Sequence, residues 1–129
     1  MSFTPGMRYV RSYVTTSQHS AKHLGSGSLE VLSTPSMILF MEDTCRAFTE
    51  GYLSENQATV GTHVDVYHVR PALIGSEVEI RSTLVQVDGR KLVFWVEAWS
   101  AGELIGYGMH ERAVVDKEKF MSRLKSSSQ

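Results

Sequence analysis

The sequence lacks several features that mark particular classes of protein. It has a single cysteine, Cys45, in 129 residues, which excludes an intrachain disulfide and a cysteine-rich metal cluster and is typical of a reducing compartment. The net charge is −1, and only the tail over residues 117–125 is loosely basic, so a dedicated nucleic-acid-binding surface is not expected. No uncharged apolar run approaches the roughly 20 residues needed to span a bilayer, and there is no apolar N-terminal signal segment. We therefore expect one cytoplasmic domain over residues 1–129, with neither membrane nor nucleic acid as a partner.

The sequence does contain one long apolar segment with helical spacing. Thr34 can cap the free amides of a helix start and Pro35 suits the first helical position, while Gly51 is a plausible stop. Between them, apolar residues recur every three or four positions, which is the stripe of a helix packed on one side. The stripe consists of Ile38, Met41, Cys45, Phe48 and Tyr52.

The remaining chain shows the period of two that is typical of strands. A first strand is expected before the helix and four more after it, the middle pair joined by a hairpin turn at residues 88–89. The residues between the first strand and the helix, 17–27, are polar and predict a loop. A short helix is expected at residues 116–124, followed by a frayed end. The five strands are expected at residues 7–15, 62–69, 78–84, 91–101 and 104–115.

This order of elements predicts an α+β fold in which a five-stranded antiparallel sheet curls around one buried helix. Such a sheet leaves strand edges exposed, and the fourth strand carries large apolar residues on both of its faces. Both features need cover, so we expect a homodimer, with a tetramer as the alternative.

Glu42 is the most informative residue, because it is a carboxylate inside the most apolar segment of the chain. A glutamate on the inner side of a helix loses hydration at a high cost unless it is paired, and such residues are often retained for chemistry. Glu42 is therefore a candidate general base or nucleophile. The alternative is a glutamate at the rim of the stripe, whose methylenes reach past the core to water.

Thr34, Gly61 and His68 are the other candidates for a site, and each has a structural alternative. Thr34 precedes Glu42 by eight residues, about 12 Å along a helix, so it either lines one groove with Glu42 or is only the N-cap. His68 shares a strand face with apolar residues, and is either a proton shuttle or a satisfied core histidine. Gly61 either presents its amide to a bound carbonyl or forms a turn.

Arg112 lies late in the last strand, on the same face as His110, Gly108 and Gly106 if the alternation is strict. The glycines leave room beside it for another backbone or a ligand. A buried arginine usually holds a carboxylate, so the structural alternative is an ion pair across the dimer. The histidines are dispersed, and no His or Cys pair stands at ligand spacing, so no metal site is expected.

These residues together resemble the fluoroacetyl-CoA thioesterase branch of the hotdog-fold thioesterases. The resemblance covers roughly residues 9–120 and depends on the order and spacing of several weak motifs. They are Thr34, Phe40-Met41-Glu42 and Cys45, then Gly61-Thr62 and His68, then Val87-Asp88-Gly89-Arg90, and finally Gly108-x-His110-Glu111-Arg112-Ala113-Val114.

The resemblance implies a hotdog fold that dimerises edge to edge and a site made of a Thr, a Glu and a His with a Gly amide near the thioester carbonyl. By position these are Thr34, Glu42, His68 and Gly61, and Arg112 matches a family arginine. It also implies an acyl-CoA thioester as the substrate, with no separate cofactor. Glu42 would attack the carbonyl or activate water, and both routes stay open.

One segment departs from the family pattern. The fluoroacetyl enzyme has a longer segment, rich in Phe and Pro, before its catalytic threonine, whereas residues 23–32 here are shorter and contain no aromatic residue. We therefore expect a thioesterase for short or medium acyl-CoAs rather than for fluoroacetyl-CoA. The alternatives are a non-catalytic acyl-CoA-binding module and a hydratase, although the Asp–His pair expected of a hydratase is not found in the sequence.

Overall fold

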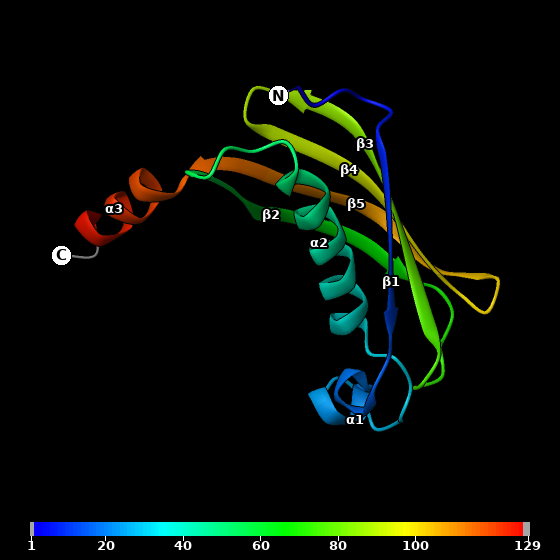
Figure 1. The fold of residues 1–129 in the computed structure, drawn as a ribbon. Helices are drawn as coiled ribbons and strands as arrows, with labels where there is room; N and C mark the ends of the chain where they lie inside the picture. The colour runs from blue at the N-terminus through cyan, green and yellow to red at the C-terminus, as the bar shows by residue number, and fades with distance from the viewer. Residues whose placement is uncertain (1, 128–129) are drawn as a thin grey trace.

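The computed structural model describes residues 2–127 as one antiparallel sheet with a long helix across one of its faces (Figure 1). The sheet has five strands in the order β1-β3-β4-β5-β2, so that β1 and β2 are its edges. The predicted α+β architecture of a sheet around one helix is thereby confirmed. In chain order the elements are β1 (Arg8–Val14), η1 (Ser17–His19), α1 (Ala21–Leu24), α2 (Thr34–Glu50), β2 (Gln57–His68), β3 (Glu77–Asp88), β4 (Lys91–Ser100), β5 (Glu103–Asp116) and α3 (Lys117–Ser127).

The start of α2 differs from the prediction in a way that matters for the site. Ser33, not Thr34, is the N-cap, and its hydroxyl accepts a hydrogen bond from the amide of Ser36 at 3.1 Å. Thr34 is already the first helical residue, so its hydroxyl is not occupied by capping. The helix ends at Gly51 as expected, and Pro35 lies in the first turn, where its missing N–H costs nothing.

The core is formed between α2 and the middle strands of the sheet. Met41, Cys45 and Phe48 are buried as predicted, whereas Ile38 and Tyr52 are only half-buried. The buried stripe is therefore rotated towards Met37, Phe40 and Thr44. It packs against side chains that alternate along β3 and β4, namely Val78, Ile80, Leu84, Leu92, Phe94 and Val96.

The segment between β1 and α2 is not the plain loop that its polar sequence predicts. It contains η1 and the short helix α1, which Ser20 caps by accepting a hydrogen bond from the amide of His23. Gly25 ends α1 with a φ of 71°, the left-handed conformation that glycine adopts without a steric penalty. Backbone bridges tie the segment to its surroundings, since Ser20 pairs with Leu32 and Val31 pairs with Leu73.

The edge strand β2 contains an irregularity that alternation alone does not show. Gly61 pairs with Arg112 of β5, but the next pair is His63 with Glu111, so Thr62 is an extra residue. Gly61 and His68 are seven residues apart, and strict alternation would place them on opposite faces of the sheet. The bulge shifts the alternation by one residue, so that both face α2.

The glycines of β5 are explained by close packing of the chain itself. A Cβ at Gly108, where φ is +156°, would meet the backbone of Asp65 and Val66 on β2. A Cβ at Gly106 would meet the side chain of Met37. The sequence predicted that these glycines leave room for either another backbone or a ligand, and the structure shows that the chain itself fills this space.

The opposite face of the sheet carries aromatic residues of β4 and β5, including Trp95, Trp99 and Tyr107, and all three are half-buried. Whether a partner covers this face, as the sequence predicts, stays a prediction. The helix α3 projects from the sheet beyond β5 (Figure 1) and runs three residues further than expected. A frayed end is predicted over residues 126–129, but residues 126–127 continue α3, and residues 128–129 lie outside the described residues. Within residues 2–127, no helix is long and apolar enough to cross a membrane.

Candidate active site

The predicted site residues meet along the line where α2 passes the edge strand β2, which we call the α2–β2 seam. Three places define it: Thr34 beside His68, Glu42 beside Gly61, and Thr49 beside Thr59. The helix and the strand run in opposite directions, so residues that are distant in sequence meet in order along the seam. Polar groups from both elements, and from β5 behind them, therefore converge on one side of the helix.

Thr34 and His68 form a direct pair at one end of the seam. The Thr34 hydroxyl and His68 Nδ1 are 2.8 Å apart, while Nε2 of the same ring is buried without a hydrogen-bond partner among the described residues. Burial lowers the pKa of His68 below its usual 6.5, because desolvation disfavours the charged ring. The imidazole is therefore neutral at pH 7 and able to accept a proton.

Glu42 lies half-buried at the middle of the seam and is directed at β2. Its Oε2 is 2.7 Å from the place where a Cβ on Gly61 would stand, so any side chain at Gly61 would displace the carboxylate from this position. Within residues 2–127 this carboxylate has neither a hydrogen bond nor an ion pair. Its neighbour Asp43 is different, because it accepts hydrogen bonds from Tyr13 and Arg46. Glu42 is thus the carboxylate of this helix turn that remains available for a ligand.

Arg112 stands behind Glu42 and Gly61, and it is 6% exposed. Its Nη1 is 3.5 Å from the place where a Cβ on Gly61 would stand, which puts the guanidinium beside the Glu42 carboxylate without a direct ion pair. Thr59 fixes it twice, through the side-chain oxygen at 2.9 Å from Nε and the carbonyl oxygen at 3.0 Å from Nη2. Sequence reasoning missed Thr59, which pairs with Val114 two ladder positions from the Gly61–Arg112 pair, because only the fold shows that β2 and β5 are neighbours.

His110 completes this group from β5. Its ring is 1% exposed, and its Nε2 lies 3.2 Å from Arg112 Nη1. The sequence showed that it shares a face with Arg112, but nothing in the pattern assigned it a role.

The structure therefore brings the five candidates together as two groups rather than one. Thr34 and His68 form the first, and Glu42, Gly61 and Arg112 form the second. No contact joins the groups among the described residues, because Thr34 and Glu42 are separated by about 12 Å of helix. Any molecule that meets both groups must lie along the seam.

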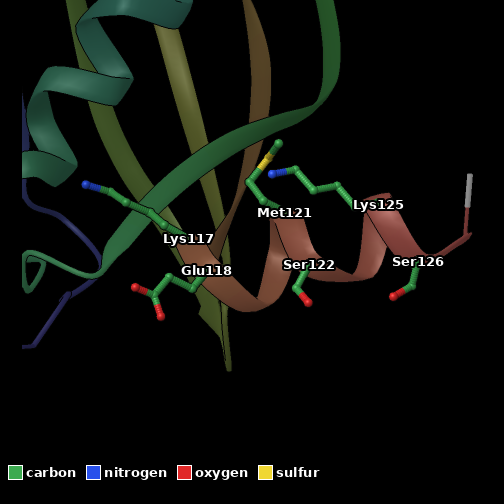
Figure 2. Close-up of a pocket in the computed structure, with 6 residues that line it drawn as sticks. All are labelled: Lys117, Glu118, Met121, Ser122, Lys125 and Ser126. Atoms are coloured by element: carbon green, nitrogen blue, oxygen red, sulfur yellow. The ribbon is translucent and has the colours of Figure 1, made fainter.

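One hollow adjoins the candidate site, and a larger one lies away from it. One of about 300 Å³ adjoins the first group, and Thr34, His68 and Arg70 line it together with Ser26 and Val31 of the preceding segment. Another of about 720 Å³ lies along α3, and Figure 2 shows that its lining residues all come from that helix. Because no polar groups from several elements converge there, the hollow along α3 is a poor candidate for chemistry.

Comparison with known proteins identifies relatives over nearly the whole chain. Residues 14–118 match the family described as fluoroacetyl-CoA-specific thioesterase, FlK. The fluoroacetyl-CoA thioesterase of Streptantibioticus cattleyicolor is 30% identical, and the match covers 95% of this chain and 93% of that protein.

Solved structures agree with this match. A structure of the fluoroacetyl-CoA thioesterase FlK superposes with a TM-score of 0.90 at 29% identity, covering 98% of each chain. A thioesterase superfamily member from Thermus thermophilus superposes with a TM-score of 0.88 at 25% identity, covering 97% of this chain and 93% of that one. The predicted hotdog arrangement is confirmed by these superpositions.

Proposed function

Because the chain belongs to the fluoroacetyl-CoA-specific thioesterase family, it is a thioester hydrolase, and we propose that it converts a short or medium acyl-CoA to the free acid and CoA. The observation that carries the proposal is the Glu42 carboxylate, which has no hydrogen-bond or ion-pair partner among the described residues and lies against Gly61 and beside Arg112. A free carboxylate next to a strand backbone and a buried cation suits attack on a carbonyl carbon better than it suits a structural role.

In the proposed reaction, Glu42 either attacks the thioester carbonyl or removes a proton from the attacking water. The Gly61 N–H stabilises the negative charge that develops on the carbonyl oxygen. The C–S bond then breaks, and the neutral His68 ring, after taking up a proton that the attacking water releases, passes that proton to the departing thiolate. Water provides the hydroxyl group of the acid and the balancing proton.

Thr34 and Arg112 position the reacting groups in this proposal. The hydrogen bond to Thr34 holds the His68 ring at the hollow that both residues line. Arg112 provides a fixed positive charge near Glu42, which complements the negative charge of the reacting groups. The distance between the two groups requires the substrate to lie along the α2–β2 seam.

The proposed acyl preference follows from the segment before α2. Ser26 and Val31 line the hollow next to Thr34 and His68, and no aromatic residue occurs in residues 23–32. Small and aliphatic side chains leave room at this end of the seam, which is why we propose chains longer than two carbons rather than fluoroacetyl. Structures of FlK variants include complexes with acetyl-CoA and with fluoroacetate and CoA, which shows only what that protein binds.

We also propose that two chains pair through β2. This strand is a sheet edge of twelve residues, and its exposed side chains include the apolar Val64 and Tyr67. Long edges that carry apolar side chains of this kind invite pairing with a second strand. Size-exclusion chromatography with light scattering at several concentrations distinguishes a monomer, which contradicts this proposal, from a dimer or tetramer.

The function is tested with a panel of acyl-CoAs of increasing chain length and a readout of released thiol. We expect release with short and medium chains, and a loss of turnover of at least about 10²-fold in Glu42→Gln and His68→Asn. Glu50→Gln is the matched control, since Glu50 lies on the same helix with a side chain that is 63% exposed and paired with Arg46. Tight binding of acyl-CoA without thiol release would instead identify a binding module.

A further inference from the structure

His110 occupies an unusual position for a histidine that the proposed reaction does not use. It lies in β5 with its ring on the α2 side of the sheet, 1% exposed, with the ring of Phe94 stacked 6.4 Å away. A buried imidazole needs partners for both nitrogens, and His110 has one for each. The chemical nature of these two partners determines the tautomer and the charge of the ring.

The hydrogen bonds of His110 specify a single tautomer. Nδ1 lies 2.8 Å from the carbonyl oxygen of His63, and because a carbonyl only accepts, Nδ1 carries the hydrogen. Nε2 lies 3.2 Å from Nη1 of Arg112, and because a guanidinium only donates, Nε2 offers its lone pair. The ring is therefore neutral.

We propose that His110 is a positioning residue whose neutral ring accepts a hydrogen bond from Arg112 and so holds the guanidinium beside Glu42 and Gly61. The inference rests on the proposed function for its effect on turnover, whereas the ring state and the hydrogen bond can be tested without turnover.

The other contacts of Arg112 explain why this hydrogen bond matters. Thr59 binds Nε and Nη2 from one side, and His110 binds Nη1 from the other, so that among the described residues three of the five N–H groups are occupied. One N–H on Nη1 and one on Nη2 remain, and Nη1 faces the Gly61–Glu42 contact. Without His110, the Nη1 side of the guanidinium is free to turn away from Glu42.

The charges around His110 favour the neutral ring. Burial is the main reason that its pKa lies below the usual 6.5, and the nearby positive charge of Arg112 lowers it further. Glu42 acts in the opposite direction, as does the hydrogen bond to the His63 backbone, while the His63 ring acts with Arg112. A proton on Nε2 would remove the acceptor and place two positive charges side by side.

Two substitutions separate the two hydrogen bonds of the ring. His110→Gln places an amide oxygen near the position of Nε2 and keeps an acceptor for Arg112, but it loses the donor to His63. His110→Asn places an amide donor near the position of Nδ1 and keeps the bond to His63, but it loses the acceptor for Arg112. We expect kcat to fall at least about tenfold in His110→Asn with a smaller change in KM, and His110→Gln to recover most of that loss.

A double-mutant comparison tests whether the effect passes through Arg112. In an Arg112→Lys background, His110→Asn should lower kcat by less than about threefold, since the guanidinium that His110 positions is already absent. Equal costs in the two backgrounds would overturn the proposal. The proposal would also be overturned if kcat in both His110 variants fell only in proportion to the fraction of folded protein, because a purely structural role predicts that result.

Nitrogen-15 NMR of the wild-type side chains provides a readout independent of activity and of whether the variants fold. We expect the Nδ1–H tautomer of His110 from about pH 6 to 8, and an Arg112 Nε–H signal that exchanges slowly with water. An Nε2–H tautomer, or a charged ring at pH 7, would refute the inference. If the wild type releases no CoA, the proposed function fails, and these spectra still decide the positioning of Arg112.

Discussion

Gly61→Ala is the sharpest test of the proposal that Glu42 is the reacting carboxylate. An added Cβ would stand 2.7 Å from Glu42 Oε2, whereas its distances to His110 Cε1 and Arg112 Nη1 are 3.4 and 3.5 Å. The last two are ordinary contacts, so only Glu42 has to move. Reaching an ordinary contact of 3.4 Å requires the oxygen to retreat by about 0.7 Å (3.4 minus 2.7).

The expected cost of this displacement falls on catalysis rather than on folding. The atom that moves is the end of a flexible, half-buried side chain, and Gly61 does not have a positive φ. Alanine is also favoured over glycine by about 0.5–1 kcal/mol in the interior of a strand, so stability should be unchanged or slightly higher. A misplacement of about 1 Å costs on the order of 10²-fold in rate, so we expect kcat to fall by roughly 10- to 100-fold.

Thiol release from acyl-CoA and urea denaturation together measure both quantities. Gly108→Ala is the contrasting variant, because its Cβ would meet the backbone of β2 at a φ of +156° and should destabilise the fold. Adding Gly61→Ala to Glu42→Gln should change little, if the alanine acts through the carboxylate. Wild-type turnover in Gly61→Ala would refute the placement of Glu42, and a marked loss of stability would refute the claim that only a side-chain end has to move.

Three further outcomes are expected. Ser33→Ala should lower the free energy of unfolding by about 1 kcal/mol in urea denaturation, because it removes the N-cap. Thr34→Val should instead slow thiol release with a smaller change in stability, and the reverse pattern would contradict the cap assignment. Burial raises the pKa of Cys45 to about 12, so thiol reagents should modify it only in denatured protein, and rapid modification of the native chain would refute this. Burial lowers the pKa of His68 and His110 below 6.5 in the folded state, so the unfolded chain binds more protons than the folded chain below that pH. Thermal melts should therefore show stability falling as the pH drops through 6.5, and the fall should be smaller in His110→Asn.

The overall fold was predictable because the long helix and the strands each have a strong local signal. The helix has a cap, a proline in its first turn and a regular apolar stripe, and the strand pairs after it are joined by short turns such as Asp88–Gly89. These signals depend on neighbours in sequence, so they need no tertiary information. The segment over residues 17–27 was predicted wrongly as a loop, because its helices η1 and α1 are too short to show periodicity.

The candidate site was predictable from sequence only in part. Periodicity singled out Glu42 as a carboxylate in an apolar helix, but it could not show that the carboxylate is directed at Gly61. Placing Thr34 at the helix cap was wrong by one residue, because both Ser33 and Thr34 can cap and only the backbone of the folded chain decides between them. Thr59 and His110 stayed unassigned, because their contribution depends on which strands are neighbours in the sheet.

The bulge at Thr62 shows most clearly why spacing alone could not complete the site. Counting by twos from His68 places Val64 and Thr62 on its face and Gly61 on the other, which would turn the Gly61 amide region away from Glu42. One extra residue between two ladder pairs corrects this, since the partners of Gly61 and Val64 in β5 are Arg112 and His110, two residues apart on one face. The hydroxyl of Thr62 donates to the carbonyl oxygen of Glu111 at 3.1 Å, so its contact is with the neighbouring strand. The register shift that it causes is a property of the two strands together rather than of the sequence around it.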